Sequence, residues 1–417
     1  MTRKNPPRDD PNRENLNNDT LPMPHGFAAG TTWCGLRPDP SHPDLGLLVA
    51  DRPYPAAALF TRNELCGAHV TLCREHLAES GGLVRAVLVN AKNANCATGT
   101  QGVDDARHLC RLVAEHLDCV PAQVLMVSTG VIGARLPVDK IEAALPDLYR
   151  SVHRDGFVDF ARAIMTTDTY AKTARLQASG DGDDFSVVGC AKGAGMIHPN
   201  MATMLAFLLT DARSTLATNL VLRGVAERSF HCLTIDGDTS PNDTVILWSS
   251  QAVWARAQDL GTATPHDPLG HAVLKVSRDL CKMIARDGEG ATRLVTVEVR
   301  GAFSESDAVH AGRTIATSPL VKTAVYGRDP NWGRILSAAG RAGVRIDTAR
   351  ARVWIGDADV YRDGAPHPEN EPRAHAHMRD HAEIVLGVDL GVGPFSADVW
   401  TCDFSPEYVT INADYRS

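Results

Sequence analysis

The sequence predicts an α/β fold of the layered α+β kind, in which β-sheets are flanked by helices. Short apolar segments of β-like composition alternate along the chain with longer stretches whose apolar residues recur at helical spacing. Alternation of this kind is typical of a layered α/β body. The 417 residues are enough to bury a large interior, so we expect either two lobes or one large body.

Five segments are predicted as strands because they are short, apolar and rich in β-branched residues. These strands are 84–89, 124–127, 204–209, 244–248 and 294–299. The helical spacing predicts four helices, at 103–117, 141–149, 214–231 and 268–286. Ser214 is a candidate N-cap, and Gly288 lies just past the end of the last helix. We expect the longer helices to cover a face of a sheet.

Two polar runs that contain glycine predict turns. Residues 180–184 read Gly-Asp-Gly-Asp-Asp and predict the tip of a hairpin, and residues 363–368 predict a surface loop. Residues 1–24 are polar and rich in proline and asparagine, with little to bury. A disordered extension is therefore expected at residues 1–24.

The charge balance argues against a nucleic-acid partner and favours a small substrate. Lysine and arginine total 42 against 50 for aspartate and glutamate, and no basic cluster is present. No apolar run approaches the roughly 18 residues that a membrane span needs, and the N-terminus lacks the apolar region of a secretion signal. We therefore expect a cytoplasmic protein that binds neither nucleic acid nor a membrane.

The cysteines predict a reducing compartment. The chain has ten of them, none in a Cys-x-x-Cys pair, and several lie inside apolar periodic segments. Such residues are typically reduced and buried in the core of a cytosolic protein.

The most informative segment, residues 192–205, reads Lys-Gly-Ala-Gly-Met-Ile-His-Pro-Asn-Met-Ala-Thr-Met-Leu. Small residues, a proline and an asparagine allow a sharp bend, and the apolar run that follows would hold Thr203 at the mouth of a strand. If the bond between Ala202 and Thr203 breaks, Thr203 gains a free α-amine beside its own hydroxyl. An α-amine with a pKa of roughly 7.7 to 8.0 can act as the base for that hydroxyl. Taken alone, such a threonine is more often a strand residue with a satisfied hydroxyl.

This segment resembles the autoprocessing site of the ornithine acetyltransferase family, also called glutamate N-acetyltransferases. In that family a Lys-Gly-x-Gly-Met run leads to a Met-Ala-Thr-Met-Leu cleavage point. Further motifs follow in the family's order along nearly the whole chain. They are Asn-Ala-Asn at 93–95, Ser-Thr-Gly-Val-Ile-Gly at 128–133, Ile-Met-Thr-Thr-Asp-Thr at 164–169, Asp-Gly-Asp-Thr-Ser at 236–240, Asn-Asp-Thr at 242–244, Asp-Gly-Glu-Gly-Ala-Thr at 287–292, Leu-Val-Lys-Thr-Ala-Val at 320–325, Asn-Trp-Gly-Arg at 331–334 and Asn-Ala-Asp-Tyr-Arg-Ser at 412–417.

The resemblance implies stacked β-sheets flanked by helices in a self-processing acyltransferase of the N-terminal-nucleophile kind. Autocatalytic cleavage between Ala202 and Thr203 would separate an α chain, residues 25–202 preceded by the extension 1–24, from a β chain of residues 203–417. Two of each would assemble into a heterotetramer. No cofactor and no metal are implied.

The resemblance also implies roles for individual residues. Thr203 would be the nucleophile, with Thr129 and Gly130 stabilising the oxyanion. Besides Thr203, one threonine of the pair Thr166 and Thr167 would contact substrate, and the sequence does not say which. The other substrate contacts would be Lys192, Glu289, Asn412 and Ser417. From local sequence alone, each has an ordinary alternative: a strand-to-loop turn, strand threonines, a solvated lysine, a loop acid or a frayed tail.

The activity implied is transfer of an acetyl group from N2-acetyl-L-ornithine to L-glutamate, through an acetyl-enzyme on Thr203 with ping-pong kinetics. Two departures bear on the substrate. Arginine-pathway members tend to read Asn-Ser-Gly-Asn-Ala-Asn where this chain has Asn-Ala-Lys-Asn-Ala-Asn at 90–95, and Asp-Pro-Asn at 329–331 resembles paralogues of antibiotic pathways. The open alternatives are a related N-acyl-amino-acid transferase of a secondary-metabolite pathway, an N-terminal-threonine amidohydrolase and a non-catalytic amino-acid-binding protein.

Other kinds of site are disfavoured by the sequence. Asp236, Asp238 and Ser240 mimic part of a calcium loop, but Pro241 replaces the needed glycine and Leu247 stands where the bidentate acid should be. The sequence also lacks His-Glu-x-x-His, Gly-x-Ser-x-Gly and a phosphate loop that ends in Gly-Lys-Ser or Gly-Lys-Thr. Zinc hydrolase, serine hydrolase and kinase activities are therefore not expected.

Overall fold

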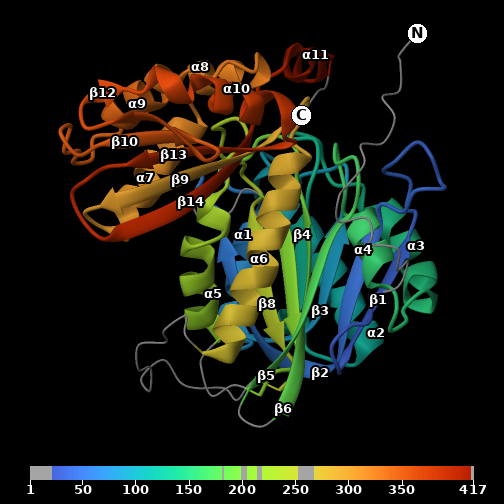
Figure 1. Cartoon of the computed structure of the whole chain (residues 1–417). Helices are drawn as coiled ribbons and strands as arrows, with labels where there is room; N and C mark the ends of the chain where they lie inside the picture. The colour runs from blue at the N-terminus through green and yellow to red at the C-terminus, as the bar shows by residue number, and fades with distance from the viewer. Residues whose placement is uncertain (1–20, 181–182, 199–203, 214–217, 252–266, 415–417) are drawn as a thin grey trace.

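Two β-sheets and the helices around them form the body of the protein (Figure 1). The computed structural model of the chain describes residues 21–180, 183–198, 204–213, 218–251 and 267–414. Within these residues, an eight-stranded sheet is built from the first part of the chain and a six-stranded sheet from the last part. The expected layered α/β architecture with stacked sheets and flanking helices is therefore confirmed.

The larger sheet has the strand order β4-β3-β2-β8-β7-β6-β5, with β1 paired to β2. Its strands are β1 Phe27–Thr32, β2 Leu45–Phe60, β3 Leu83–Asn90, β4 Val124–Ser128, β5 Lys172–Gly180, β6 Asp183–Lys192, β7 Leu205–Thr210 and β8 Thr244–Ser249. β3 and β4 run parallel, as do β7 and β8, whereas β6 and β7 are antiparallel. Strands β7 and β8 thus lie between β2 and β6, although they follow all the other strands of this sheet along the chain.

Helices cover both faces of this sheet. They are α1 Ala68–Glu79, α2 Gly99–Leu117, α3 Val138–Arg150, α4 Phe157–Ala163, α5 Thr218–Glu227 and α6 Pro268–Arg286. In β7, Phe207 packs with Phe160 of α4, while Leu208 packs on the other face with residues of α5 and α6. Because both faces are buried, the strand is apolar throughout and does not alternate with polar residues.

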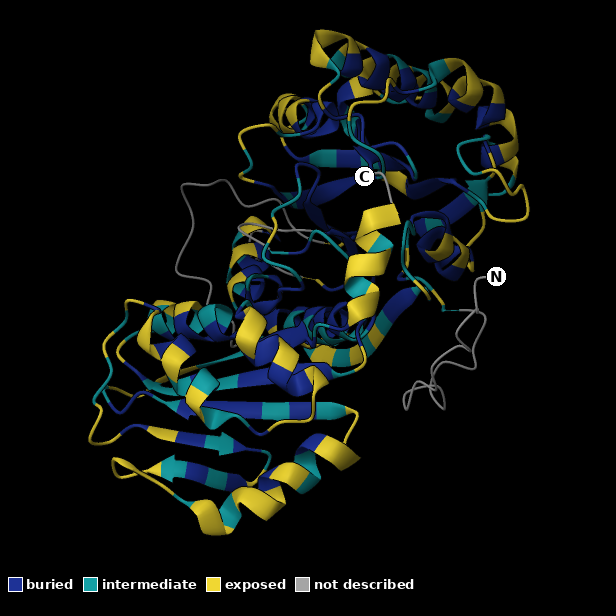
Figure 2. Ribbon diagram, turned by 90° about the horizontal axis from the view of Figure 1, so that it is seen from above, coloured by how far each residue is buried: buried dark blue, intermediate teal, exposed yellow. Residues whose placement is uncertain are grey.

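The smaller sheet has the order β12-β11-β10-β13-β9-β14. Its strands are β9 Leu294–Ala302, β10 Arg352–Ile355, β11 Ala358–Arg362, β12 Ala365–Pro366, β13 Glu383–Asp389 and β14 Phe395–Cys402. The helices of this part of the chain are α7 Glu305–Ala316, α8 Pro319–Tyr326, α9 Trp332–Gly340, α10 Glu371–Asp380 and α11 Pro406–Asp414. α6 contacts β5 and β6 of one sheet and β9 and β14 of the other, and one continuous apolar core spans both. Figure 2 shows the strands largely buried and the outer sides of the helices exposed.

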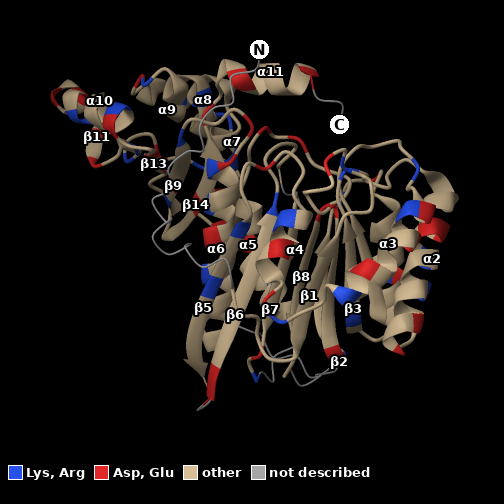
Figure 3. Ribbon diagram, turned by 90° about the vertical axis from the view of Figure 1, so that its right-hand side faces the viewer, with Lys and Arg blue, Asp and Glu red and all other residues tan. Residues whose placement is uncertain are grey.

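The surface carries charges of both signs. Figure 3 shows basic and acidic residues intermingled on α2 and α3. Arg107 of α2 pairs with Glu75 at 2.7 Å, and His108 lies 3.1 Å from Glu142 of α3. Among the helices that the structure describes, none combines the length and the apolar character that crossing a membrane requires.

The five predicted strands are confirmed as β3, β4, β7, β8 and β9, and the predicted helix 268–286 matches α6. The helix predicted at 214–231 is wrong at its end, because α5 stops at Glu227. Ser229 leaves the helical conformation with φ −136° and ψ −88°, and a 3₁₀ turn follows at Phe230–Cys232. The predicted cap Ser214 lies outside the described residues.

Four smaller predictions have mixed outcomes. Gly180 pairs with Asp183, as a hairpin requires, although the tip itself lies outside the described residues. The loop at 363–368 is wrong in part, because Ala365–Pro366 forms the short strand β12 against β11. All ten cysteines are free thiols, and eight of them are buried. Residues 1–20 of the predicted extension lie outside the described residues, whereas Leu21 and Met23 pack against the core.

Candidate active site

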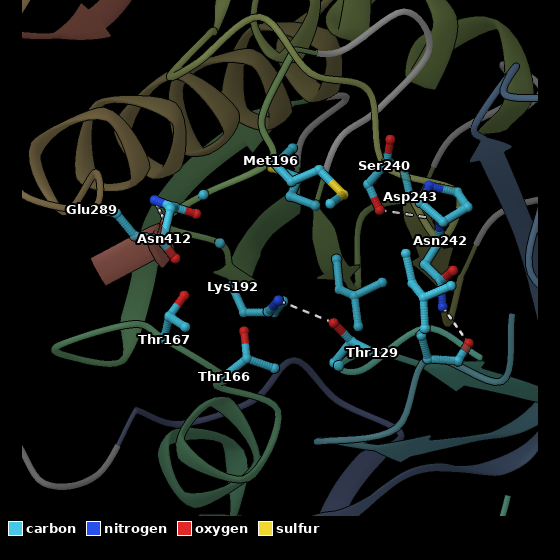
Figure 4. Close-up of a pocket in the computed structure, with 18 residues that line it drawn as sticks. Thr129, Thr166, Thr167, Lys192, Met196, Ser240, Asn242, Asp243, Glu289 and Asn412 are labelled. Atoms are coloured by element: carbon cyan, nitrogen blue, oxygen red, sulfur yellow. Dashed lines mark hydrogen bonds between the residues drawn. The ribbon is translucent and has the colours of Figure 1, made fainter. Parts of the chain in front are cut away.

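A cavity of about 110 Å³ lies where loops of the larger sheet meet the loop after α6 and the C-terminal helix α11 (Figure 4). Every predicted site residue that the structure describes lines it: Thr129, Gly130, Thr166, Thr167, Lys192, Glu289 and Asn412. Ala202, Thr203 and Ser417 lie outside the described residues. Met204 and Leu205, which follow Thr203 directly, line the same cavity.

Separate elements deliver these side chains to one place. Thr129 and Gly130 follow β4, while Lys192 is the last residue of β6. Lys192 pairs with Leu205, the first residue of β7. Because β6 and β7 are antiparallel, the end of one and the beginning of the other lie side by side. The register therefore places the chain just after Thr203 beside Lys192.

Lys192 and Thr129 are directly hydrogen-bonded. The Lys192 ammonium donates to the Thr129 hydroxyl oxygen over 3.0 Å. Burial lowers the pKa of Lys192, although Asp168 acts in the opposite direction. Since the Thr129 oxygen accepts this bond, its own proton remains available to donate to a group in the cavity.

Gly130 has a backbone conformation that only glycine adopts without strain. Its φ is +136°, and a Cβ atom would lie 2.2 Å from the carbonyl carbon of Lys92. The neighbouring amides are used, because Thr129 N–H donates to Asn90 and Val131 N–H donates to Lys92. Among the described residues, no acceptor is hydrogen-bonded to the Gly130 amide. A hydroxyl and an unpaired amide side by side are the donors that an oxyanion hole requires.

The loop that supports Gly130 is strained and tied down. Lys92, Asn95 and Ala97 have positive φ values of 70°, 46° and 57°. The Asn242 side-chain amide donates to the carbonyls of Ala94 and Ser128. Strain of this kind persists only where the surroundings enforce it, and it is concentrated at functional sites.

A buried charge cluster fixes another wall of the cavity. The Lys172 ammonium lies 2.6 Å from both Asp168 and Asp287, and its side chain is fully buried. Asp168 also accepts from the amides of Thr166 and Gly193. Burial alone would raise the pKa of Asp168, but the ammonium groups of Lys172 and Lys192 outweigh it and hold that pKa below its usual value. Burial raises the pKa of Asp287, and Lys172 opposes the rise.

Glu289 and Asn412 close the cavity from the C-terminal side. The Asn412 amide donates to the Glu289 carboxylate over 2.9 Å, and the Glu289 amide donates to the Ala194 carbonyl. A Cβ atom on Gly195 would lie 2.3 Å from the same carboxylate, so glycine is needed for its approach. Asn412 therefore lies at the cavity and not in a frayed tail.

Two acidic residues near the cavity were not predicted from sequence. Asp243 lines the cavity with 1% of its surface exposed, and burial raises its pKa well above the usual value. Asp236 accepts hydrogen bonds from the amides of Met196 and Ile197. Both lie in motifs quoted above, and an acid beside an apolar strand is the signal that could have found them. In the described part of the chain, no cluster of His, Cys, Asp or Glu is arranged to hold a metal ion.

Comparison with known proteins gives consistent matches. The model of the ArgJ family matches residues 28–417. The arginine biosynthesis bifunctional protein ArgJ of Methylococcus capsulatus is 45% identical over 98% of this chain and 99% of its own length. Its counterpart in Thermus thermophilus is 44% identical over 95% and 99%. A solved ornithine acetyltransferase from Mycobacterium tuberculosis, in complex with ornithine, is 36% identical over 43% of this chain and 94% of that chain, with a TM-score of 0.40.

Proposed function

The chain belongs to the ArgJ family, and from this premise we propose that it transfers an acetyl group from N2-acetyl-L-ornithine to L-glutamate. It is an acyltransferase of arginine biosynthesis. The relatives at 41% to 45% identity bear the name of arginine biosynthesis bifunctional proteins, which favours that pathway over an antibiotic pathway. The departures at 90–95 and 329–331 therefore do not outweigh the match over nearly the whole chain.

The proposed maturation is self-cleavage between Ala202 and Thr203. The Thr203 hydroxyl oxygen attacks the Ala202 carbonyl carbon, and the peptide C–N bond breaks as its nitrogen takes up a proton. Water then hydrolyses the resulting ester, which leaves a carboxylate on Ala202 and a free amine on Thr203. The products are an α chain that ends at Ala202, with residues 1–24 as its expected extension, and a β chain of residues 203–417, which we expect to assemble as two of each in the cytoplasm.

In the proposed transfer, Thr203 attacks the acetyl carbonyl of N-acetylornithine and passes its proton through its own amine to the leaving nitrogen. The hydroxyl of Thr129 and the amide of Gly130 would stabilise the oxyanion. Glutamate then takes the acetyl group from the acetyl-enzyme. The Glu289 carboxylate complements an ammonium group of either amino acid, while Lys192, Thr166 or Thr167, Asn412 and Ser417 complete the substrate contacts.

One observation carries this proposal. The Thr129 hydroxyl, oriented by Lys192, lies next to the Gly130 amide in a cavity that Met204 and Leu205 also line. A hydroxyl and an amide that could stabilise an oxyanion thus lie beside the residues that follow Thr203, which supports the proposed role of Thr129 and Gly130. An N-terminal-threonine amidohydrolase would share this arrangement but would pass the acetyl group to water.

Intact-mass spectrometry tests the proposal. We expect two chains that meet between Ala202 and Thr203, with an acetyl increment on the β chain after brief exposure to N-acetylornithine. Thr203→Ala should remain a single chain without the increment, whereas Thr203→Ser should still cleave. Glutamate should remove the increment as N-acetylglutamate. Release of acetate at the same rate with and without glutamate would contradict acyl transfer, and an uncleaved wild-type chain would contradict self-processing.

A further inference from the structure

A second cavity, of about 670 Å³, lies between α7 and the end of α5. Arg313 of α7 lines it, together with His231, which follows α5, and His198, which follows β6. A cavity of this size is within the range that holds small-molecule ligands. None of the site residues predicted from sequence lines it.

Arg313 is a partly buried cation that lines this second cavity. Within the described residues, its guanidinium makes no ion pair or hydrogen bond, whereas Arg228 nearby is held by Glu305 at 2.7 Å. Burial lowers the pKa of Arg313. A guanidinium presents five N–H donors, and leaving them unsatisfied in a partly buried place is costly.

His231 adds unsatisfied hydrogen-bonding capacity to the same space. The buried Nε2 of His231 has no hydrogen-bond partner in the described part of the chain. Burial, together with the positive charge of Arg313, lowers the pKa values of His231 and His198 to about 4. Arg313 is therefore close enough to both imidazoles for its positive charge to disfavour theirs.

The remaining charges of the cavity do not neutralise Arg313. Glu305 is already engaged by Arg228 through both of its oxygens. Glu227 is exposed at the end of α5, and Arg341 adds a second positive charge. Thr239, Ser306 and Thr314 also line the cavity, but the hydroxyls of Thr239 and Thr314 already donate to the carbonyls of His198 and His310. The chain as a whole carries a net charge of −8, so attraction of an anion here has to be local.

We propose that this second cavity binds the phosphate group of a small molecule, with Arg313 and His231 as its principal contacts. A phosphate offers several acceptor oxygens at once, which matches a guanidinium, an imidazole N–H and the hydroxyl of Ser306. The bound anion supplies the counter-ion that Arg313 lacks. This site is separate from the acetyl-transfer chemistry and does not depend on it.

The two cavities share a wall. Met196 lines the first and His198 the second, and Ser240 and Thr239 are divided in the same way. The Thr239 hydroxyl donates to the His198 carbonyl over 3.1 Å, which ties the two segments together. An anion in the second cavity therefore lies against the back of the segments that enclose the first.

Direct binding of inorganic phosphate to the purified full-length protein, by calorimetry in a phosphate-free buffer, tests the proposal. We expect saturable binding that weakens at least about tenfold in Arg313→Gln, since one charge-assisted contact is lost. The matched control is Arg223→Gln, which removes an exposed arginine of α5 outside the cavity. Lys192→Met removes the cation of the first cavity. Both controls should bind phosphate as the wild type does.

Several outcomes would overturn the assignment. These are equal binding by Arg313→Gln and the wild type, loss of binding in Lys192→Met, absence of saturable binding in the wild type, and binding of succinate without binding of phosphate. If Arg313→Gln does not fold, as judged by circular dichroism, His231→Gln replaces it. That variant should weaken phosphate binding several-fold, and unchanged binding would reject the site.

Discussion

The Thr129 hydroxyl oxygen accepts a hydrogen bond from Lys192, so its own proton is free to donate to a group in the cavity. We expect Thr129→Ala to lower kcat for acetyl transfer by about a hundred- to a thousandfold, the usual effect of losing one oxyanion donor. KM should change little, because the interaction strengthens in the transition state. Thr129→Ser keeps the hydroxyl and should retain most of the activity. Equal losses in both variants would assign the effect to the threonine methyl group.

His69 makes stability depend on pH. It is fully buried, and burial lowers its pKa from 6.5 to about 4. The unfolded chain therefore binds a proton near pH 6.5 that the folded chain does not take up until about pH 4. The contribution of neutral His69 to the unfolding free energy is therefore fully present above pH 6.5. As the pH falls from 6.5 to about 4, it decreases by up to about 1.4 kcal/mol per pH unit.

We expect His69→Gln to remove that part of the slope. Urea unfolding at pH 7 and pH 5 should show a smaller loss of unfolding free energy in the variant than in the wild type. His198 and His231 keep their lowered pKa values in both proteins, so some slope remains. Equal slopes would mean that His69 is protonated in the folded protein or already neutral in the unfolded one.

The sequence predicted which residue types gather at the site better than it predicted how they are held. Thr129, Lys192 and Glu289 stood out because they lie within long motifs. Asp168 and Asp243 lie in quoted motifs as well, but they did not stand out, because the importance of Asp243 comes from its burial and that of Asp168 from a cluster with Lys172 and the distant Asp287. Those distances are set by the order of strands and not by local sequence.

The start of β5 is fixed to the end of α6 by the Lys172 cluster. Lys172→Met would leave the carboxylates of Asp168 and Asp287 buried without their cation. We expect the unfolding free energy to fall by about 3 to 5 kcal/mol, as for other broken buried ion pairs. Chemical denaturation at pH 7 measures this change.

Lys275→Met is the matched control, because Lys275 pairs with Asp279 on the exposed side of α6. That substitution should cost less than about 1 kcal/mol. Similar effects of the two substitutions would show that the Lys172 cluster contributes no more than a surface pair.

Helices and strands were predictable where one local signal dominated. α6 has a regular apolar face and an Asp267 side chain that accepts from the amide of Gly270 at its N-terminus. β2 was not predicted, because Pro53 and Pro55 interrupt its apolar pattern and its register shifts between Val49 and Tyr54. The predicted end of α5 was wrong, because the Ser229 hydroxyl donates to the carbonyl of Val225 and the chain turns there.

At the scale of the whole molecule, the proposed cleavage would leave two interleaved chains. β7 and β8 would belong to the β chain, yet β7 pairs with β6 and β8 pairs with β2, both of the α chain. The boundary between the chains thus runs through the larger sheet, whereas the two sheets divide between β8 and β9.

We therefore expect the cleaved protein to elute as one species in native size-exclusion chromatography and to give two bands on a denaturing gel. Thr203→Ala, as the uncleaved control, should elute at the same volume with one band. Separation of the fragments in native buffer would contradict this strand order. The apolar composition predicted β7 and β8, but it could not predict that they insert between the earlier strands β2 and β6.

Because Lys192 pairs with Leu205, the new N-terminus of the β chain would lie beside a strand that is already part of the sheet. A chain terminus is normally the part that frays most easily, but this one would arise two residues before an interior strand of a finished sheet. Once the bond is cut, refolding is no longer a unimolecular reaction. The two chains would have to meet in solution and rebuild the middle of a sheet, at a rate that depends on their concentration. The mature protein would then persist because it unfolds slowly and not because it readily reforms.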